Sequence, residues 1–565
     1  MTTFFKQALR AHQAGQAASA EALYRQAIAA GIEVRSARHN LALLLLERRA
    51  FAEAKALLVE LIASPEADAA THFMLARIFL AEGDAAAALA PLELAHSLEP
   101  GSVPVRLELA RLLAAKTEFR RARALLEEVS MTAPPPERLA ALRARAEIEI
   151  AWADLDPVEE AEHLAQAEQS LRAAVAMAPQ HPALLNNLAM LLRRQGALAE
   201  AETHARRLLA LAPQVPESSL TLAAVLAGRD PQREAAAVTL LERAAVAAPH
   251  HPSLTWNLAH SLMRLQRWPE GWQRYARRFE RPQRVPPPPG PLWDGKPTDK
   301  PLLIWGEQGY GNVIQFARFL PRLATLTPHL ILACQAPLLR LFAGLPGLGE
   351  VADFAATLPP YGAHYPLLDL GLALGIQAKD LPGAIPYLKA PDADAPWNEL
   401  RSAPVPRIGI VWVGNRHPDP HRSTTLDRFV RLAQRFDLSF FSLQIGPAAA
   451  DIAREGQGRI VDLAPLVRDF ADTAAAIAQF DLVITIDTAV AHLAGAMGAE
   501  GWVLLPHRAG WMWHFDPERS SWYPNLRLFR QTSVGDWDGV FARLELALAD
   551  WLVQGRGAEP IGRPD

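Results

Sequence analysis

The sequence predicts an all-helical repeat array followed by an α/β region, and two observations support this prediction. Leu41, Leu75 and Leu109 lie 34 residues apart, and an alanine follows each of them. A 34-residue period with small residues on two short helices is typical of helix–turn–helix repeats that stack into a superhelix. From Pro301 onward, short apolar runs alternate with helical patterns, which is typical of parallel sheets covered by helices.

Composition restricts the class of protein. The chain has 565 residues, too many for one domain, and its 50% hydrophobic and 21% charged residues are typical of a folded protein. A net charge of −4 gives no reason to expect a nucleic acid partner. Cys334 is the only cysteine, which excludes a disulfide framework and a cysteine metal cluster. The first residues lack a long apolar core and the run Leu41–Leu46 is short, so we expect no signal peptide, no transmembrane segment and a cytoplasmic location.

The repeat register extends over residues 2–280. Ala8 and Ala20 precede Ala42 and Ala54 by one period, and the pattern returns downstream at Ala189, Ala201, Ala223, Ala235 and Ala259. Prolines separate most units, because proline cannot continue a helix interior. The register breaks at Pro134–Pro136, and residues 136–179 predict a longer helix pair, which is either one repeat or an insertion. The pattern resembles the tetratricopeptide repeat (TPR) family, which implies a superhelix that binds a protein.

Three asparagines stand two residues before the register alanine, namely Asn40, Asn187 and Asn257. In the TPR arrays of protein O-GlcNAc transferases, an asparagine at this place faces the concave groove and holds a peptide backbone. The resemblance therefore implies a peptide-binding role, which suits an amide because it both donates and accepts hydrogen bonds. The alternative is a solvated or capping asparagine, since other repeats hold different residue types here: Met74, Glu108 and Thr221.

Residues 281–300 form a proline-rich linker. Pro286–Pro289 are consecutive prolines, which favours a semi-rigid spacer. Trp268, Trp272 and Tyr275 precede it, so we expect the last aromatic-rich helix of the array to dock on the next domain. The alternative is a loose linker.

Two series of strands and helices follow the linker. In the first, strands are expected at 302–305 and 330–333, with helices at 314–326 and 338–343. In the second, strands are expected at 408–413, 440–443, 481–486 and 502–505, with helical stretches between them. The division near 391–404 predicts two Rossmann-like halves, 301–395 and 404–552, which face a cleft and bind ligands at the carboxyl ends of their strands.

Two turns after predicted strands are candidates for ligand binding. In the first, Gly306, Gly309 and Gly311 let backbone N–H groups approach a ligand, although a glycine turn alone is weak evidence. In the second, Asp487 ends a strand and can N-cap the next helix, and His492 lies one turn after Thr488. A phosphate at this helix N-terminus is favoured by the helix dipole. The alternative is a capped helix with a surface histidine.

The order of short motifs resembles the heptosyltransferase-related branch of GT-B glycosyltransferases over roughly residues 265–550. The motifs are the glycine turn 306–311, Val411–Asn415, Arg422-Ser423, Ser442–Gln444, Asp469–Thr473 and the segment from Asp487 to His492. The resemblance implies that 301–395 is the acceptor half and 404–552 the donor half. It also implies a set of donor-binding residues: Gly414, Arg422, Ser423, Gln444, Asp487, Thr488 and His492. Arg422 suits donor phosphate because a guanidinium pairs with it bidentately.

One position departs from that family. Its glycine turn usually ends in an aspartate that serves as general base, but this chain has Asn312, and an amide cannot take a proton at neutral pH. The candidate bases are therefore Glu307 in the same turn and His417 or His421 in a later loop, because histidine titrates near neutral pH. That loop could instead be a rigid polar segment.

We expect no metal. Asp392-Ala393-Asp394 has the spacing of a metal motif but lies between the two halves, so Arg422, Thr488 and the helix dipole would stabilise the leaving group. Trp511, Trp513 and Trp522 either stack a base, line an acceptor entrance or pack between domains.

Together these features predict a metal-independent protein O-glycosyltransferase without a cofactor beyond its nucleotide-sugar co-substrate. The array would hold a protein, and the α/β region would transfer a sugar to a Ser or Thr hydroxyl. TPR arrays fused to this type of domain also resemble bacterial flagellin glycosyltransferases, which implies flagellin as acceptor and a nonulosonic acid on CMP as donor. UDP- and ADP-sugars stay open. The alternatives are a catalytically inactive adaptor and an envelope-glycan transferase, and Asn312 favours the adaptor.

Overall fold

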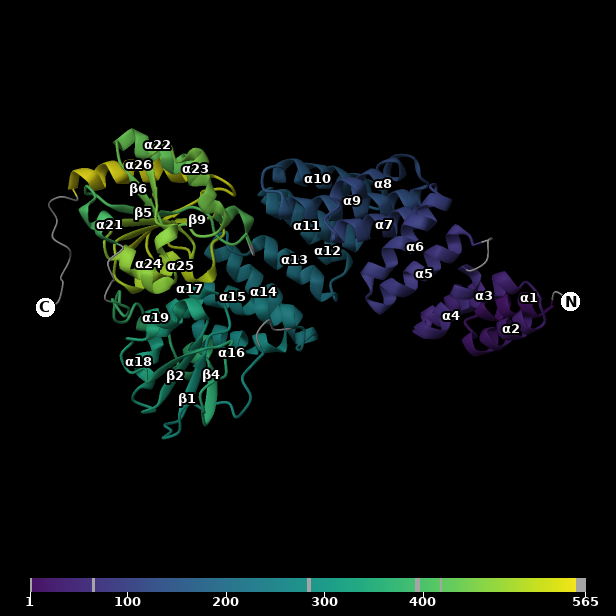
Figure 1. Cartoon of the computed structure of the whole chain (residues 1–565), viewed down its shortest axis with the longest axis horizontal. Coiled ribbons are helices and arrows are strands. Elements are labelled where there is room, and N and C mark those ends of the chain that lie inside the picture. The colour runs from purple at the N-terminus through teal and green to yellow at the C-terminus, as the bar shows by residue number, and fades with distance from the viewer. Residues whose placement is uncertain (1–2, 63–66, 282–285, 392–396, 417–418, 555–565) are drawn as a thin grey trace. The chain divides into compact units, whose positions relative to one another are not determined.

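The computed structural model describes residues 3–62, 67–281, 286–391, 397–416 and 419–554 (Figure 1). The chain divides into two compact units, Met1–Leu192 and Arg193–Asp565. The division falls inside the helical region and not at the proline-rich linker, so the second unit combines the last repeat helices with both sheets. Among the described residues, no helix combines the length and apolarity that a membrane span requires.

The first unit is a series of antiparallel helix pairs. The register alanines Ala42, Ala76 and Ala110 are completely buried, because each lies where neighbouring helices approach most closely. The helices are α1 (Thr3–Gln13), α2 (Ala17–Ala29), α3 (Val34–Glu47), α4 (Phe51–Ile62), α5 (Ala69–Glu82), α6 (Ala85–Leu98), α7 (Val103–Ala115), α8 (Phe119–Thr132), α9 (Pro135–Leu155), α10 (Glu160–Met177) and α11 (Pro182–Gln195). The predicted long pair is α9 and α10, with 21 and 18 residues.

The second unit begins with further helices of the same kind, to which the end of α11 leads. They are α12 (Leu198–Leu211), α13 (Pro216–Leu226), α14 (Pro231–Ala247), α15 (Pro252–Arg264), α16 (Trp268–Ala276) and the 3₁₀ helix η1 (Arg277–Glu280). Proline stands at the first turn of α13, α14, α15 and α16, where its missing N–H costs no helical hydrogen bond.

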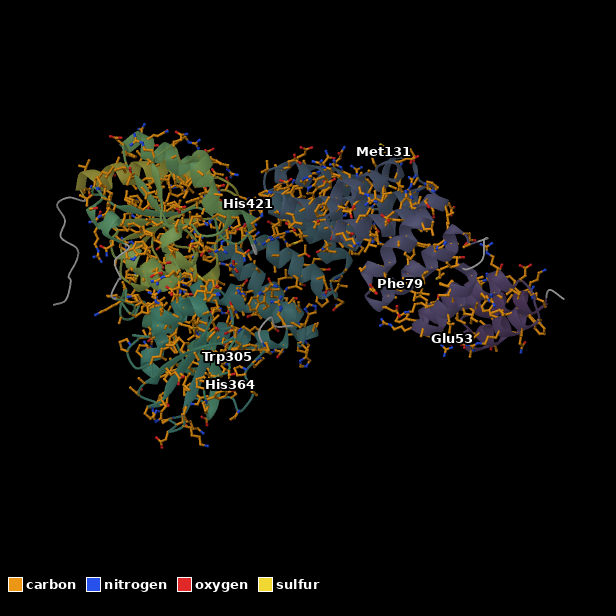
Figure 2. All side chains as sticks on the ribbon, in the orientation of Figure 1. Glu53, Phe79, Met131, Trp305, His364 and His421 are labelled. Carbon is orange, nitrogen blue, oxygen red and sulfur yellow. The ribbon has the colours of Figure 1, made fainter. Side chains whose placement is uncertain are left out.

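A four-stranded parallel sheet follows, with strand order β3-β2-β1-β4. Its strands are β1 (Leu302–Trp305), β2 (Leu330–Cys334), β3 (Glu350–Asp353) and β4 (Ala363–Pro366). Short helices connect the strands: α17 (Tyr310–Phe316), η2 (Ala317–Phe319), α18 (Leu320–Leu323), η3 (Ala336–Leu338) and α19 (Leu339–Phe342). Further short helices follow β4: η4 (Leu367–Asp369), α20 (Leu370–Ala373), η5 (Ala378–Asp380) and α21 (Asn398–Ser402). Trp305 and His364 lie on the neighbouring strands β1 and β4, and the Trp305 indole N–H donates to His364 Nδ1 at 3.2 Å (Figure 2).

A six-stranded parallel sheet completes the chain, with strand order β10-β9-β8-β5-β6-β7. Its strands are β5 (Ile408–Val411), β6 (Phe440–Ser442), β7 (Ile460–Asp462), β8 (Leu482–Ile486), β9 (Gly501–Leu505) and β10 (Leu526–Arg530). The helices are η7 (Pro420–Arg422), α22 (Leu426–Phe436), η8 (Pro447–Ala450), α23 (Asp451–Glu455), η9 (Ala464–Leu466), α24 (Phe470–Ile477), α25 (Ala489–Ala496), η10 (Trp511–Trp513) and α26 (Trp537–Gln554). An α/β region with two parallel sheets thus follows the helical array.

Several predicted boundaries differ from the observed ones. The helix expected at 314–326 begins earlier, at Tyr310, and is broken into α17, η2 and α18 before it ends at Leu323. The described end of the linker is not a free spacer, because Trp293 N–H donates to His364 O at 2.9 Å and His364 N–H donates to Pro291 O at 3.0 Å. Residues 291–293 therefore lie along the edge strand β4 and form an isolated bridge with it. Linker residues 282–285 lie outside the described residues.

The last repeat helix docks on the four-stranded half, as its aromatic residues predict. The Trp272 indole N–H donates to Ile376 O at 2.9 Å. Its ring lies against Gly371, where an added Cβ would stand 2.5 Å from a ring carbon. Only a residue without a side chain allows this contact, so Gly371 lets the Trp272 ring lie directly against the α20 backbone.

Candidate functional site

The two predicted ligand-binding turns meet each other. The first turn leads from β1 into α17, and the second leads from β8 into α25; the two helices pack side by side between the sheets (Figure 1). At their contact, a Cβ on Gly311 would stand 2.7 Å from His492 Cδ2 and 3.4 Å from Ala489 Cα. Because both contacts involve the first turns of the helices, the carboxyl ends of β1 and β8 are brought together.

Arg422 and Asp487 form an ion pair beside the start of α25. The distance from Arg422 Nη2 to Asp487 Oδ2 is 3.1 Å, and the same nitrogen donates to Asp487 O. The two side chains are 18% and 13% exposed, so the pair is largely withdrawn from water. The expectation that Asp487 N-caps α25 is wrong, because its carboxylate faces Arg422 and Thr488 occupies the N-cap position without a side-chain capping bond. Thr488 Oγ1 instead lies 3.2 Å from Thr485 Oγ1.

The other predicted donor residues surround this pair or support it. A Cβ on Gly414 would stand 3.3 Å from Thr488 Cγ2 and 3.7 Å from Arg422 Nε, so Gly414 belongs to the same cluster. Ser423 Oγ accepts from Gly414 N–H at 3.1 Å. The Gln444 side-chain amide forms hydrogen bonds with the backbone. Its Oε1 accepts from Trp412 and Val413 N–H, and its Nε2 donates to Ile445 O.

His492 is buried and not a surface residue, which excludes that alternative. Its ring stacks on Trp513 with centroids 5.4 Å apart, and Nδ1 lies 3.2 Å from Tyr523 Oη. Burial lowers the pKa of His492 to about 4, so the imidazole is neutral at physiological pH. It thus places the Cδ2–Nε2 edge of a neutral ring against Gly311 and contributes no charge.

Glu307 is bound to an arginine of the last repeat segment. Arg278 belongs to η1, and the distance from its Nη2 to Glu307 Oε1 is 2.6 Å. Its other terminal nitrogen, Nη1, pairs with the Asp369 carboxylate. All three side chains are nearly inaccessible, with 2%, 3% and 8% exposure for Arg278, Glu307 and Asp369. Burial raises the pKa of Glu307 and Arg278 opposes that rise. The second carboxylate oxygen, Oε2, has no hydrogen-bond partner among the described residues.

Asn312 takes part in a short amide chain. Its Nδ2 donates to Gln308 Oε1 at 2.8 Å, and Gln308 Nε2 donates to Tyr275 Oη at 2.7 Å. Tyr275 belongs to α16, so the glycine turn is again held by the last repeat helix. Asn312 and Glu307 thus lie in the same turn, and both are connected to the array.

The histidine loop is described only in part. His417 lies outside the described residues, and so does the segment Asp392-Ala393-Asp394. His421 Nε2 lies 2.8 Å from Arg194 O, at the end of α11, which holds the loop against the array (Figure 2). His421 N–H donates to Asp419 Oδ1 at 2.9 Å.

Three arginines at the same end of the six-stranded sheet were missed by sequence reasoning. Arg193 Nε and Arg508 Nη2 both donate to one acceptor, Ala224 O, and Arg530 Nη2 donates to Trp513 O and His514 O. Within the described part of the chain, none of the three has a carboxylate oxygen within 4 Å. Burial lowers the pKa of Arg508 and the charges of Arg193 and Arg264 lower it further. Because a guanidinium keeps its proton at neutral pH, the cluster carries three positive charges, and the nearest carboxylates, which are those of Asp419, Glu234, Asp487 and Asp516, oppose them without a direct ion pair.

Sequence signals existed for two of these arginines only. Arg508 follows β9 and Arg530 ends β10, so both lie at carboxyl ends of parallel strands, where ligands bind. Arg193 belongs to α11, and only the fold brings it to the sheet. We name Arg193, Arg508 and Arg530 the arginine cluster.

Of the three tryptophans after β9, Trp511 and Trp522 pack against the last repeat helix, and Trp513 stacks on His492. Trp522 stacks on Trp268 with centroids 5.5 Å apart, and Trp511 meets Trp272 edge-to-face at 5.9 Å. Both are almost completely buried. Their role is therefore to fix α16 against the sheets.

The predicted peptide-binding asparagines are all half-buried. Asn257 Nδ2 donates to Ser253 O in its own helix, at 2.8 Å. Asn187 Oδ1 accepts from Asn186 Nδ2 at 3.1 Å. Asn40 lies in α3. In Asn187 and Asn257, part of the amide is thus occupied within the array.

Comparisons with known proteins support the repeat array. The tetratricopeptide repeat family model matches residues 79–146. Protein FlbA of Caulobacter vibrioides is 28% identical over 323 residues, which are 51% of this chain and 54% of FlbA, so the match spans about half of that relative. The N-terminal region therefore contains TPR repeats, and the chain is weakly similar to FlbA.

Solved TPR structures also match parts of the chain. A thermophilic TPR protein of Thermus thermophilus shares 23% identity and covers 34% of this chain and 99% of its own, with a TM-score of 0.29. PilF of Pseudomonas aeruginosa shares 18% identity and covers 39% and 95%, with a TM-score of 0.33. Yeast Tom70 shares 14% identity and covers 46% and 54%, with a TM-score of 0.32.

Proposed function

We propose that the α/β region is a glycosyltransferase of the GT-B type, which transfers a sugar from a nucleotide donor to a Ser or Thr hydroxyl of a protein bound by the repeats. The observation that supports this most directly is the contact of Gly311 with His492. It brings the turns after β1 and β8 together, and parallel sheets bind ligands at these carboxyl ends. One sheet would then hold the donor and the other would face the acceptor.

The donor phosphate would bind at Arg422, Thr488 and the start of α25. Arg422 Nε is buried and has no hydrogen-bond partner among the described residues, so it can donate to a phosphate oxygen. If a phosphate replaced the Asp487 carboxylate as the partner of Arg422, the positive charge of the guanidinium would still be neutralised. Charge that develops on the leaving group would be stabilised by Arg422 and the helix dipole without a metal ion.

The arginine cluster supports a strongly anionic donor. Its guanidinium groups are held by carbonyl oxygens and not by carboxylates, so an incoming oxyanion finds oriented donors. CMP-linked nonulosonic acid, as in the resemblance to flagellin glycosyltransferases, fits this charge. UDP- and ADP-sugars fit the phosphate-binding residues equally.

For the acceptor hydroxyl, Glu307 is our candidate base. Burial raises the pKa of its carboxyl, and Oε2 is free of hydrogen bonds to the described residues. Arg278 would position the carboxylate through Oε1. His417 is the second candidate base.

A thermal-shift measurement tests the donor site first. We expect UDP, ADP, GDP or CMP to raise the melting temperature of the full chain, and we expect Arg422→Ala and Thr488→Ala to abolish that rise. Arg431→Ala is the matched control, because Arg431 is 62% exposed and pairs with Asp427 on the surface of α22. The responding nucleotide would then be tested as a sugar donor, with protein acceptors and without them.

The second candidate function is a non-catalytic adaptor. Asn312 cannot act as a base, and Glu307 is paired with Arg278, so the glycine turn could serve only to join the array to the sheets. An adaptor would show no nucleotide response and would tolerate Arg422→Ala in the cell. Sugar transfer without any protein acceptor would instead favour an envelope-glycan enzyme.

A further inference from the structure

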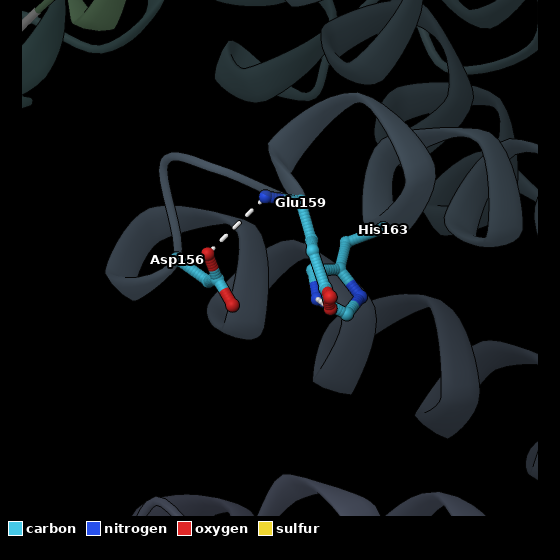
Figure 3. Close-up of side chains that lie close together, drawn as sticks. All are labelled: Asp156, Glu159 and His163. Atoms are coloured by element: carbon cyan, nitrogen blue, oxygen red, sulfur yellow. Dashed lines mark hydrogen bonds and ion pairs between the residues drawn. The ribbon is translucent and has the colours of Figure 1, made fainter.

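A group of acidic side chains and a buried histidine lies at the turn between α9 and α10. Asp156 is the first residue after α9, Glu159 immediately precedes α10 and His163 lies in the first turn of α10 (Figure 3). One ligand atom from each residue lies within 4.8 Å of the other two. The site belongs to the long helix pair that interrupts the 34-residue register.

The His163 ring is held in position by the buried carboxylate of Glu149. Its Nδ1 lies 2.8 Å from Glu149 Oε2, and Glu149 is fully buried. The imidazole also stacks on Trp152, with centroids 4.1 Å apart. Donation from Nδ1 to Glu149 sets the tautomer and leaves the lone pair of the ring on Nε2.

The other ring nitrogen points at the acidic residues without a bond to them. His163 Nε2 is buried and has no hydrogen-bond partner among the described residues. Glu159 Oε2 lies 3.7 Å from it, beyond hydrogen-bond distance (Figure 3). A nitrogen lone pair opposite a carboxylate is unfavourable unless a positive charge lies between them.

The carboxylate of Asp156, the third residue of the group, is held in place by backbone N–H groups. Its Oδ1 accepts from Val158 N–H at 3.1 Å and from Glu159 N–H at 3.2 Å (Figure 3). This turn fixes the carboxylate but leaves Oδ2 available. Glu159 is half exposed, so its side chain can move by the small distance that coordination requires.

We propose that Asp156, Glu159 and His163 bind one divalent first-row transition metal cation, with Zn²⁺ as the expected ion and water as the remaining ligand. One imidazole and two carboxylates suit this class of ion, and two carboxylates balance its charge. Glu149 is a positioning residue that orients the histidine, as carboxylates behind metal-bound histidines commonly do. The cation would clamp the turn that joins α9 to α10.

The competing explanation is a proton in place of the metal, which would make His163 an imidazolium between Glu149 and Glu159. Calorimetric titration of the metal-free full chain with ZnCl₂ distinguishes the two. We expect one Zn²⁺ per chain, and we expect Glu159→Gln and Asp156→Asn each to weaken binding at least tenfold. Zinc should also raise the melting temperature of the wild-type chain but not of these variants.

Glu200→Gln is the matched control. His204 Nε2 lies 3.7 Å from Glu200 Oε1, which repeats the distance and the four-residue spacing of His163 and Glu159. We expect this variant to bind zinc like the wild type, and X-ray absorption should show one imidazole nitrogen with oxygen ligands. The absence of zinc binding, or equal affinity in the wild type and Glu159→Gln, would overturn the proposal. Because the site belongs to the first unit, these results do not depend on the glycosyltransferase proposal.

Discussion

At the scale of single residues, the second unit contains histidines that are buried without charge. Burial lowers the pKa of His260, His492 and His514 to about 4 in each case. His514 Nδ1 lies 3.3 Å from Arg264 O, and His492 contacts the Tyr523 hydroxyl, so both form neutral hydrogen bonds. These residues are compatible with the fold only as uncharged rings.

This predicts that stability falls in weak acid. The folded-state pKa of each histidine lies below its unfolded value near 6.5, so the unfolded chain binds more protons as pH falls from about 7 towards 4. Each histidine then costs about 2 kcal/mol of unfolding free energy at pH 5 relative to pH 7.5. We expect His514→Asn to reduce the difference between urea unfolding at pH 7.5 and pH 5 by about this amount.

Asparagine is the suitable replacement because its amide does not titrate and can keep a hydrogen bond to Arg264 O. The control for the substitution itself is His181→Asn, at an exposed position immediately before α11. An unchanged pH dependence in His514→Asn would show that His514 is not buried as an uncharged ring.

At the scale of elements, the approach of α17 to α25 depends on one glycine. A Cβ at Gly311 would overlap His492 and press on the α25 backbone, whereas a Cβ at Gly309 would meet nothing within 4 Å. We expect Gly311→Ala to lower stability by about 1–3 kcal/mol through overpacking and to abolish the nucleotide response. Gly309→Ala, two residues away in the same turn, should do neither. Urea unfolding and the thermal-shift assay measure both effects, and equal behaviour of the two variants would contradict the proposed joining of the turns.

The elements also show what the sequence could predict. The strands that were expected, β1, β2, β5, β6, β8 and β9, are all interior strands of their sheets. Interior parallel strands are covered on both faces, so they read as continuous apolar runs. The four strands that were missed, β3, β4, β7 and β10, are all edge strands, and the side chains of β3 and β7 are mostly exposed or half-buried.

Some residues of the candidate site could likewise be predicted from the sequence, and others could not. Asp487, Thr488 and Gly414 could be found because they follow buried strands, and ligands bind at the carboxyl ends of parallel strands. Arg193 and Arg278 could not, because each lies on a helix whose own pattern is that of a repeat. Their role comes from tertiary packing, which cannot be predicted from the local periodicity of the sequence.

At the scale of the whole molecule, the boundary of the stable α/β part lies within the repeats and not at the linker. Without residues before 281, Trp511 and Trp522 would lose Trp268 and Trp272, and two buried carboxylates would lose Arg278. An unpaired buried charge is strongly destabilising.

We therefore expect a fragment of residues 193–565 to unfold cooperatively, and a fragment of residues 281–565 to lack a cooperative thermal transition. Circular dichroism melting tests this directly. Tryptophan emission at longer wavelength in the shorter fragment would report the exposed indoles. Equal melting of both fragments would show that the last repeats are dispensable for the sheets.

The Arg278 contacts have a consequence for how such a chain can evolve. Repeat arrays change length by duplication or loss of whole units, and each unit contacts only its neighbours. In this chain the last repeat segment cannot be replaced by a copy of another repeat, because Trp268 and Trp272 pack on the tryptophans after β9. Arg278 in addition pairs with Glu307 in the glycine turn. Natural variation in the number of repeats should therefore be confined to the N-terminal side of Arg193, while the final repeats keep a fixed count and sequence.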